Sequence, residues 1–225
     1  MVLLDGKKTA QDIQLEIAEK VKCLKAEGKK APHLAAILVG GDGASLTYVN
    51  AKVKACEKVG FESTLVHMDA TTSEEDLLKK IAELNKDDSI DGFIVQLPLP
   101  EHIDETKVTL AVSPSKDVDG FHPENIGKMC LNLPTFLPAT PNGVLEMLKR
   151  YNIETSGKHC VVIGRSHIVG SPMSILMARN GNPGNATVTL AHSRTVNLKE
   201  VCASADILIA AVGKPLFVTA DMVKP

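Results

Sequence analysis

Tyr48 and Lys52 are the first residues in this chain whose types and spacing suggest chemistry. They lie in a segment that is predicted to be helical and to end near Gly60, where a four-residue step places both side chains on one face. The tyrosine ring could stack on a flat heterocycle, and the lysine amine could donate or accept a proton. A surface pair without function would show the same spacing, so the interpretation depends on other segments.

Gln96 and two aspartates offer polar groups for the same chemistry. Gln96 directly follows the apolar run Gly92–Val95, at the expected carboxyl end of a buried strand, where α/β proteins bind ligands. Its amide both donates and accepts, which suits an amide-rich ring or a lysine partner. The string Lys116-Asp-Val-Asp-Gly120 adds the carboxylates of Asp117 and Asp119, one of which could accept paired N–H donors from a ring. A glutamine that only satisfies backbone groups, and a turn with solvated charges, remain open alternatives.

A glycine-containing turn in Val161–Gly170 is predicted to join a strand to a helix. The N–H groups at such a helix start can hold a pyrophosphate. The G-x-G-x-x-G fingerprint falls on Gly164, Ser166 and Val169, so only its first glycine matches. Ser166 could instead offer a hydroxyl to a phosphate. An ordinary strand-to-helix turn is the alternative.

The end of the next predicted strand indicates which nucleotide would bind. It reads His192-Ser193-Arg194 and has no carboxylate for the ribose 2′-hydroxyl of NAD. Arg165 and Arg194 could form charge-assisted hydrogen bonds to a 2′-phosphate. The sequence therefore favours NADP as cofactor, and two solvated surface arginines are the alternative.

Composition argues against several other classes of function. The formal net charge of −2, with two tyrosines, five phenylalanines and no tryptophan, favours neither nucleic-acid binding nor an anionic membrane surface. No apolar run approaches the roughly eighteen residues of a membrane span, and no secretory signal is expected. Scattered histidines and five widely spaced cysteines predict no metal site and the reduced, mostly buried thiols of a cytoplasmic protein.

Helix and strand patterns alternate along the whole chain, which predicts an α/β fold of two lobes with a ligand cleft between them. Thr9 is expected to cap the first helix, Pro114–Pro141 to be irregular, and the lobes to join near residues 140–150. No internal repeat is visible. The predicted helices are Ala10–Ala26, the segment with Tyr48 and Lys52, Ser73–Leu84, Gly143–Tyr151, Ser171–Arg179 and a short one before Asp206. The predicted strands are Leu34–Val39, Phe61–His67, Gly92–Gln96, His159–Ile163, Ala186–Ala191 and Asp206–Ala210.

Taken together, these segments resemble the bifunctional methylenetetrahydrofolate dehydrogenase/methenyltetrahydrofolate cyclohydrolase family. The resemblance covers almost the whole chain. It rests on six strings in order: Tyr48-x-x-x-Lys52, Asp91-Gly-Phe-Ile-Val-Gln-Leu-Pro-Leu-Pro100, Lys116-Asp-Val-Asp-Gly120, Pro138-Ala-Thr-Pro141, Gly164-Arg-Ser-x-x-Val-Gly-x-Pro172 and His192-Ser-Arg-Thr195.

The resemblance implies a catalytic folate-binding domain over residues 1–141 and a Rossmann-like NADP-binding domain over residues 142–225. The implied activity is NADP-dependent oxidation of 5,10-methylenetetrahydrofolate to 5,10-methenyltetrahydrofolate, followed by hydrolysis to 10-formyltetrahydrofolate. The resemblance also implies a cytoplasmic homodimer that serves one-carbon metabolism and purine biosynthesis.

The family's site residues carry over by matching motif. Lys52 resembles the catalytic lysine of the cyclohydrolase step, which could accept a proton from the attacking water and return it on ring opening. Gln96 would be its hydrogen-bonding partner. The remaining residues implied for the folate site are Tyr48, which stacks on the ring system, Asp119, which holds the pterin-like ring, Asp117, which helps, and Val95 and Leu97, which contact the substrate. Those implied for the NADP site are Gly164, Arg165 and Ser166 at the phosphates and Ser193 and Arg194 near the 2′-phosphate.

Two departures from the family pattern carry expectations of their own. Asn180–Asn185 is longer than the usual turn before the second nucleotide-binding strand, and it is expected to shift the adenosine end of the site. Family members also continue beyond Lys224-Pro225 with a Pro-Gly-Gly-Val-Gly-Pro segment and a final helix. The C-terminal part of the second domain is therefore expected to be missing here, with part of both sites.

Two rival interpretations remain. A shikimate-type NADP-dependent dehydrogenase would explain the second lobe, but not the pair Tyr48 and Lys52 with Gln96. A folate- or dinucleotide-binding protein without catalysis would not need Lys52.

Overall fold

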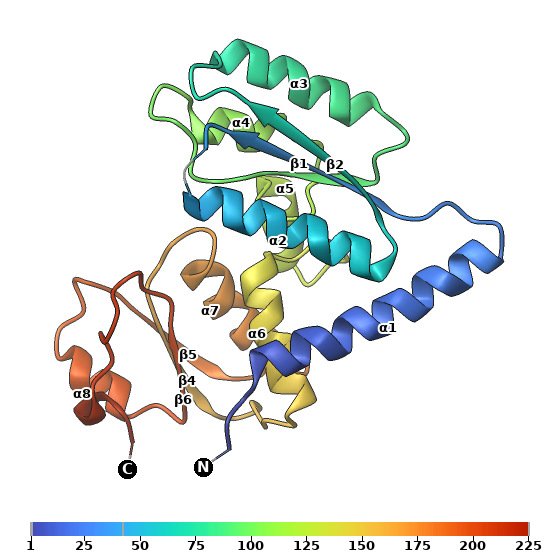
Figure 1. Ribbon diagram of the computed structural model, residues 1–225. Coiled ribbons are helices and arrows are strands. Elements are labelled where there is room, and N and C mark those ends of the chain that lie inside the picture. The colour runs from blue at the N-terminus through green and yellow to red at the C-terminus, as the bar shows by residue number, and fades with distance from the viewer. Residues whose placement is uncertain (1, 42, 225) are drawn as a thin grey trace. The chain divides into compact units, whose positions relative to one another are not determined.

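The chain forms two compact units, each built on its own parallel sheet (Figure 1). The computed structural model describes residues 2–41 and 43–224. The first unit is Met1–Pro123 and the second is Glu124–Pro225. The predicted α/β fold with two domains is confirmed, because helices alternate with parallel strands in both units.

The first unit places helices on both faces of a sheet with the strand order β2-β1-β3. Alternate residues of β1 point to opposite faces. Ala35 and Ile37 pack with α3 and α4, whereas Ala36 and Leu38 pack with Val49 of α2. The elements are α1 (Gly6–Ala26), β1 (His33–Val39), α2 (Gly43–Val59), β2 (Glu62–Met68), α3 (Glu74–Lys86), β3 (Gly92–Val95) and α4 (Glu105–Ala111).

The second unit repeats this arrangement with the strand order β5-β4-β6. Cys160 and Val162 of β4 pack against α5, α6 and α7, whereas Val161 and Ile163 pack against α8 and the final 3-10 turn. The elements are α5 (Pro123–Cys130), α6 (Ala139–Arg150), β4 (His159–Ile163), α7 (Gly170–Ala178), β5 (Thr187–Ala191), α8 (Leu198–Ala203), β6 (Ile207–Ala210) and η1 (Ala220–Met222).

The two sheets also share a way of closing the amino end of the central strand. In the first, His33 N donates to Asp91 Oδ2 over 2.7 Å and Asp91 N donates to His33 O over 3.0 Å. In the second, His159 N donates to Asp206 Oδ2 over 3.0 Å and Asp206 N donates to His159 O over 2.9 Å. The sequence showed no internal repeat, but the structure has one at the level of topology and hydrogen bonding.

The first helix starts earlier than predicted. Its N-cap is Asp5, whose Oδ1 accepts a hydrogen bond from Lys8 N over 3.0 Å, so the predicted cap at Thr9 is wrong. Thr9 is buried inside α1, and its hydroxyl donates to Asp5 O. The predicted cap of α3 is confirmed, since Ser73 Oγ accepts from Asp76 N. Among the residues that the structure describes, no helix is both long and apolar enough to cross a membrane.

The segment Pro114–Pro141 is more regular than predicted. Pro123 opens α5 and Pro141 lies in the first turn of α6, positions where the missing proline N–H costs no helical hydrogen bond. Met129 of α5 packs in the core of the second unit with Leu145 and Leu148 of α6. The compact units therefore divide at Pro123, earlier in the chain than the boundary that the sequence suggested.

The long turn Asn180–Asn185 lies at the amino end of β5. The hydroxyl of Thr155 donates to Gly184 O over 2.8 Å and accepts from Gly184 N over 2.9 Å, and Gly157 N donates to Asn185 O. The turn after β4 that carries Gly164 lies at the carboxyl end of the same parallel sheet. The long turn Asn180–Asn185 is thus held at the edge of the sheet opposite the Gly164 turn. This position argues against the expected shift of the adenosine end of the nucleotide site.

Candidate active site

Lys52 and Gln96 meet in the first unit although they lie on different elements. Lys52 Nζ is 3.4 Å from Gln96 Oε1, a long and therefore weak hydrogen bond. Gln96 N donates to Ile37 O over 2.9 Å, which continues the pairing of β3 with β1 by one residue. Gln96 Nε2 donates to Leu97 O over 2.7 Å. With the side-chain nitrogen directed to Leu97 O, the amide oxygen faces the lysine.

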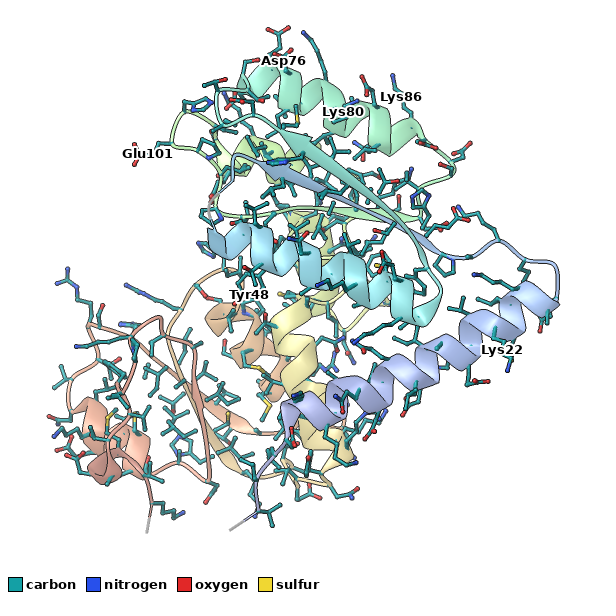
Figure 2. All side chains as sticks on the ribbon, viewed as in Figure 1. Lys22, Tyr48, Asp76, Lys80, Lys86 and Glu101 are labelled. Carbon is teal, nitrogen blue, oxygen red and sulfur yellow. The ribbon has the colours of Figure 1, made fainter. Side chains whose placement is uncertain are left out.

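Tyr48 lies one helical turn before Lys52 on α2, and 66% of its surface is exposed. Figure 2 shows its side chain projecting from that helix. An exposed ring beside a half-buried amine is available to cover a flat ligand bound over the lysine. Both residues lie within α2, as predicted, and their four-residue spacing places them on one face of that helix.

Asp119 reaches the same place because the chain before it runs alongside β3. Phe93 pairs with Asp117 in a parallel bridge, and Phe93 N donates to Lys116 O over 2.9 Å. A Cβ on Gly92 would lie 2.3 Å from Val118 Cγ1 and 3.3 Å from Lys116 O, so a larger residue would require the Val118 side chain to move. The pairing with β3 carries Asp119 to the end of that strand.

The surroundings of Asp119 raise the pKa of its carboxyl group. Burial raises its pKa above the ordinary value of 3.8; the positive charge of Lys52 lowers the pKa and the negative charge of Asp117 raises it. Lys52 and Asp119 are thus electrostatically coupled, and the structure brings Lys52, Gln96 and Asp119 together.

A pocket beside Asp119 gathers several of the predicted substrate contacts. Val95, Leu97, Asp117 and Asp119 all line it. Sequence reasoning missed the other lining residues, which come from β3, α4 and the segment after Asp119: Phe93, Ile94, Val108, Thr109, Val112 and Phe121. Phe121 could have been found from the sequence, because it directly follows the Lys-Asp-Val-Asp-Gly string. The residues of α4 carried no such signal, because that helix was not predicted.

The glycine-containing turn of the second unit is tightly packed. Gly164 has a φ of +107°, and a Cβ there would lie 2.2 Å from Ala211 O. A Cβ on Gly170 would lie 2.0 Å from Gly164 O and 2.9 Å from Arg165 N. Gly170 therefore allows the close approach of helix and turn that the fingerprint assigns to its third glycine. The G-x-G-x-x-G fingerprint placed its third glycine at Val169, one residue before the glycine that has this role in the structure.

Ser166 organises the start of α7. Its Oγ accepts from Val169 N over 3.2 Å and from Gly170 N over 3.3 Å. A hydroxyl oxygen that accepts these bonds keeps its own hydrogen for a further acceptor. The hydroxyl hydrogen of Ser166, at the start of α7, is therefore a donor that fits a phosphate oxygen.

Arg165, Ser193 and Arg194 are exposed at the same edge of the second sheet. Ile163 of β4 and Ala191 of β5 are in register, so Arg165 and Ser193 each lie two residues beyond paired positions. The second turn is held by Arg194 N, which donates to His192 Nδ1 over 3.1 Å. Two guanidinium groups beside the phosphate-type turn fit a ligand with an additional phosphate.

Two family models match the chain. The model described as tetrahydrofolate dehydrogenase/cyclohydrolase, catalytic domain, matches residues 4–119. The model described as tetrahydrofolate dehydrogenase/cyclohydrolase, NAD(P)-binding domain, matches residues 138–225. Together they cover most of both compact units.

Individual proteins agree with these matches. The bifunctional protein FolD of Cytophaga hutchinsonii is 70% identical over 224 residues, which are 100% of this chain and 77% of that protein. The crystal structure of the FolD methylenetetrahydrofolate dehydrogenase/cyclohydrolase of Campylobacter jejuni has a TM-score of 0.95 and 45% identity, covering 100% of this chain and 78% of that one. The Trypanosoma brucei enzyme, complexed with NADP cofactor and inhibitor, has a TM-score of 0.93 and 34% identity, covering 99% and 75%.

Proposed function

Because the chain belongs to the tetrahydrofolate dehydrogenase/cyclohydrolase family, we propose that Lys52 is the proton carrier of a bifunctional folate enzyme. The enzyme oxidises 5,10-methylenetetrahydrofolate with NADP and hydrolyses the resulting 5,10-methenyl compound to 10-formyltetrahydrofolate. NADP, when bound, supplies the hydride acceptor. The contact between Lys52 Nζ and Gln96 Oε1 beside Asp119 is the observation that carries the residue assignment.

In the hydrolytic step, water adds to the 5,10-methenyl cation and loses a proton. Lys52 acts once its ammonium group has released a proton to the solvent; the neutral amine then takes the proton of the water and returns it to the ring nitrogen when the ring opens. Gln96 suits this exchange because its amide oxygen orients the lysine without taking the proton. The long 3.4 Å contact lets the amine turn toward the substrate.

The other folate residues bind and orient the substrate. The ring of Tyr48 stacks on the pterin-like system, Asp119 accepts its paired N–H donors, and Asp117 supports Asp119. Val95 and Leu97 provide apolar contacts in the pocket that they line. Such positioning accounts for much of the catalysis in a hydride transfer, where the reacting atoms belong to substrate and cofactor.

The NADP residues act at the turn after β4 and the turn after β5. The backbone at Gly164, the side chain of Arg165 and the hydroxyl of Ser166 hold phosphate oxygens, and Ser193 with Arg194 holds the 2′-phosphate. The fit rests on the close approach of Gly170 to Gly164 and on the donors described above.

We further propose a cytoplasmic homodimer that binds no nucleic acid and contributes to purine biosynthesis. The family resemblance supports the assembly and the pathway, and the net charge of −2 supports the absence of nucleic-acid binding. Sedimentation at several protein concentrations measures the assembly. A monomer at every concentration would contradict it.

The proton-carrier assignment is tested by Lys52→Met. With 5,10-methylenetetrahydrofolate and NADP as substrates, NADPH and the 10-formyl product are followed separately. We expect the 10-formyl product to fall far more than NADPH, since only hydrolysis needs the amine. Lys54→Met, which removes an exposed lysine from the same helix, is the matched control and should change neither product. Full hydrolysis by Lys52→Met would refute the assignment.

A further inference from the structure

Asp117 differs from Lys52, Gln96 and Asp119, the other polar residues of the folate site, in being almost fully buried, with 5% of its surface exposed. Its two carboxylate oxygens bind backbone N–H groups of residues that follow it in the chain. Oδ1 accepts from Gly120 N over 3.0 Å, and Oδ2 accepts from His122 N over 2.8 Å. Each is a charge-assisted hydrogen bond of normal length.

The backbone of Asp117 is held independently of its side chain. Asp117 N donates to Ser113 O over 2.9 Å, and the residue pairs with Phe93 beside β3. The preceding residue is anchored as well, since Lys116 Nζ donates to Leu84 O and Asp87 O near the end of α3. The backbone of Asp117 is therefore anchored, and its carboxylate can hold the residues that follow it in place.

What it holds is the turn that carries Asp119. The carboxylate of Asp117 closes a loop through Gly120, whose φ is +71°. Gly120 N is also 3.3 Å from Asp117 O, a weaker contact than the one to the carboxylate. Asp119 lies inside this closed loop, so its position follows from the two hydrogen bonds that Asp117 accepts.

We infer that Asp117 is the positioning residue of the folate site, which presents Asp119 to the substrate and does not bind the substrate itself. This inference rests on the proposed function for its consequence in catalysis. Both carboxylate oxygens of Asp117 are buried and already accept backbone N–H groups, so they are poorly suited to bind the pterin-like ring of the substrate. Asp119, only half-buried and facing Lys52, is the carboxylate available for that contact.

The substitution Asp117→Asn tests the inference in the free protein. The amide keeps one acceptor oxygen but turns an NH₂ toward the second backbone N–H, so one hydrogen bond is lost. We expect the amide hydrogen that loses its acceptor, that of Gly120 or that of His122, to exchange about tenfold faster or more, as measured by NMR without any ligand. Asp119→Asn is the matched control and should leave both amides protected. Unchanged exchange in Asp117→Asn would overturn the inference.

A second measurement tests the charge effect of Asp117 on Asp119. Among the described residues, the charges that shift the pKa of Asp119 are those of Lys52 of α2 and of Asp117. Removing the negative charge of Asp117 lets Asp119 remain ionised at lower pH. The acidic limb of kcat/KM for the folate should therefore move to lower pH, while the KM for folate rises about tenfold and the KM for NADP stays unchanged. An unchanged acidic limb would overturn the inference.

The exchange measurement needs no substrate, so it decides the role of Asp117 in the turn separately from the proposed function. Loss of every folate product in the unsubstituted protein would count against the proposed function alone. Should Asp117→Asn fail to fold, Asp117→Ser keeps a short acceptor without the charge. The same two amides should then exchange faster than in the unsubstituted protein, and full protection would again overturn the inference.

Discussion

Gly170 lies so close to Gly164 that a Cβ on the first would be 2.0 Å from the carbonyl oxygen of the second. The atoms that this Cβ would meet, in Gly164 and Arg165, all belong to the backbone, so no flexible side chain can move aside. The contact joins the start of α7 to the turn after β4. The phosphate-type site therefore depends on a glycine that no ligand needs to touch.

Gly170→Ala should destabilise the protein by about 2 kcal/mol or more, because the backbone of the turn must move to admit the methyl group. The KM for NADP should rise, while folate binding by the first unit is retained. Thermal unfolding and separate titrations of both ligands measure these effects. Gly143→Ala is the control: that glycine lies in α6 with open space around it and should gain roughly 0.5–1 kcal/mol. Equal stability of the two variants would contradict the packing argument.

Arg165→Ala and Arg194→Ala should change the choice of nucleotide. A charge-assisted hydrogen bond to the 2′-phosphate contributes about 1.5–3 kcal/mol, so each substitution should raise the KM for NADP about tenfold or more. The KM for NAD should stay the same in Arg194→Ala, since NAD has no 2′-phosphate, and in Arg165→Ala it should rise less than the KM for NADP. Lys199→Ala removes an exposed positive charge from the same unit, where it pairs with Asp221, and should leave the preference intact. If the ratio of the two KM values is unaffected by both arginine substitutions, the assignment of NADP contacts fails.

Asp119→Asn should raise stability at neutral pH while it abolishes tight folate binding. Burial raises the pKa of Asp119 above 3.8, so the folded protein holds this proton more tightly than the unfolded chain does. The carboxyl costs no stability below its unfolded pKa, and stability falls as pH rises through the raised folded pKa. The neutral amide avoids that loss. Melting temperatures of the two proteins should differ at neutral pH and converge in acid; a lower melting temperature for Asp119→Asn at neutral pH would contradict this account.

Leu216→Gly should stabilise the second unit. Leu216 has a φ of +57° and is 94% exposed, so it adopts a left-handed backbone conformation without burying its side chain. That conformation costs an L-residue about 1–2 kcal/mol, of which part is regained by glycine despite its greater freedom in the unfolded chain. Denaturant unfolding measures the difference. Val196→Gly is the matched control, because Val196 is 79% exposed with an ordinary φ and should only lose stability. Similar losses at both positions would contradict the strain argument.

Much of the fold could be predicted because its signals are local. The run His159–Ile163 is a strand with the predicted bounds, and α3 begins at its predicted serine cap. Pro123 misled the prediction, since proline breaks a helix interior but starts a helix well. The cap of α1 was misplaced because Asp5 and Thr9 are both good capping residues, and only the formed helix shows which one is used.

The sequence by itself determined that Tyr48 and Lys52 share a helical face and that a glycine turn follows β4, since helical spacing and turn chemistry depend on neighbours along the chain. Tertiary structure alone decided that Gln96 meets Lys52 and that the segment beside β3 carries Asp119 to them. It also decided that Gly170 is the glycine that packs on Gly164. These relationships join backbones distant in sequence, through hydrogen bonds and close approaches that exist only once both sheets have formed.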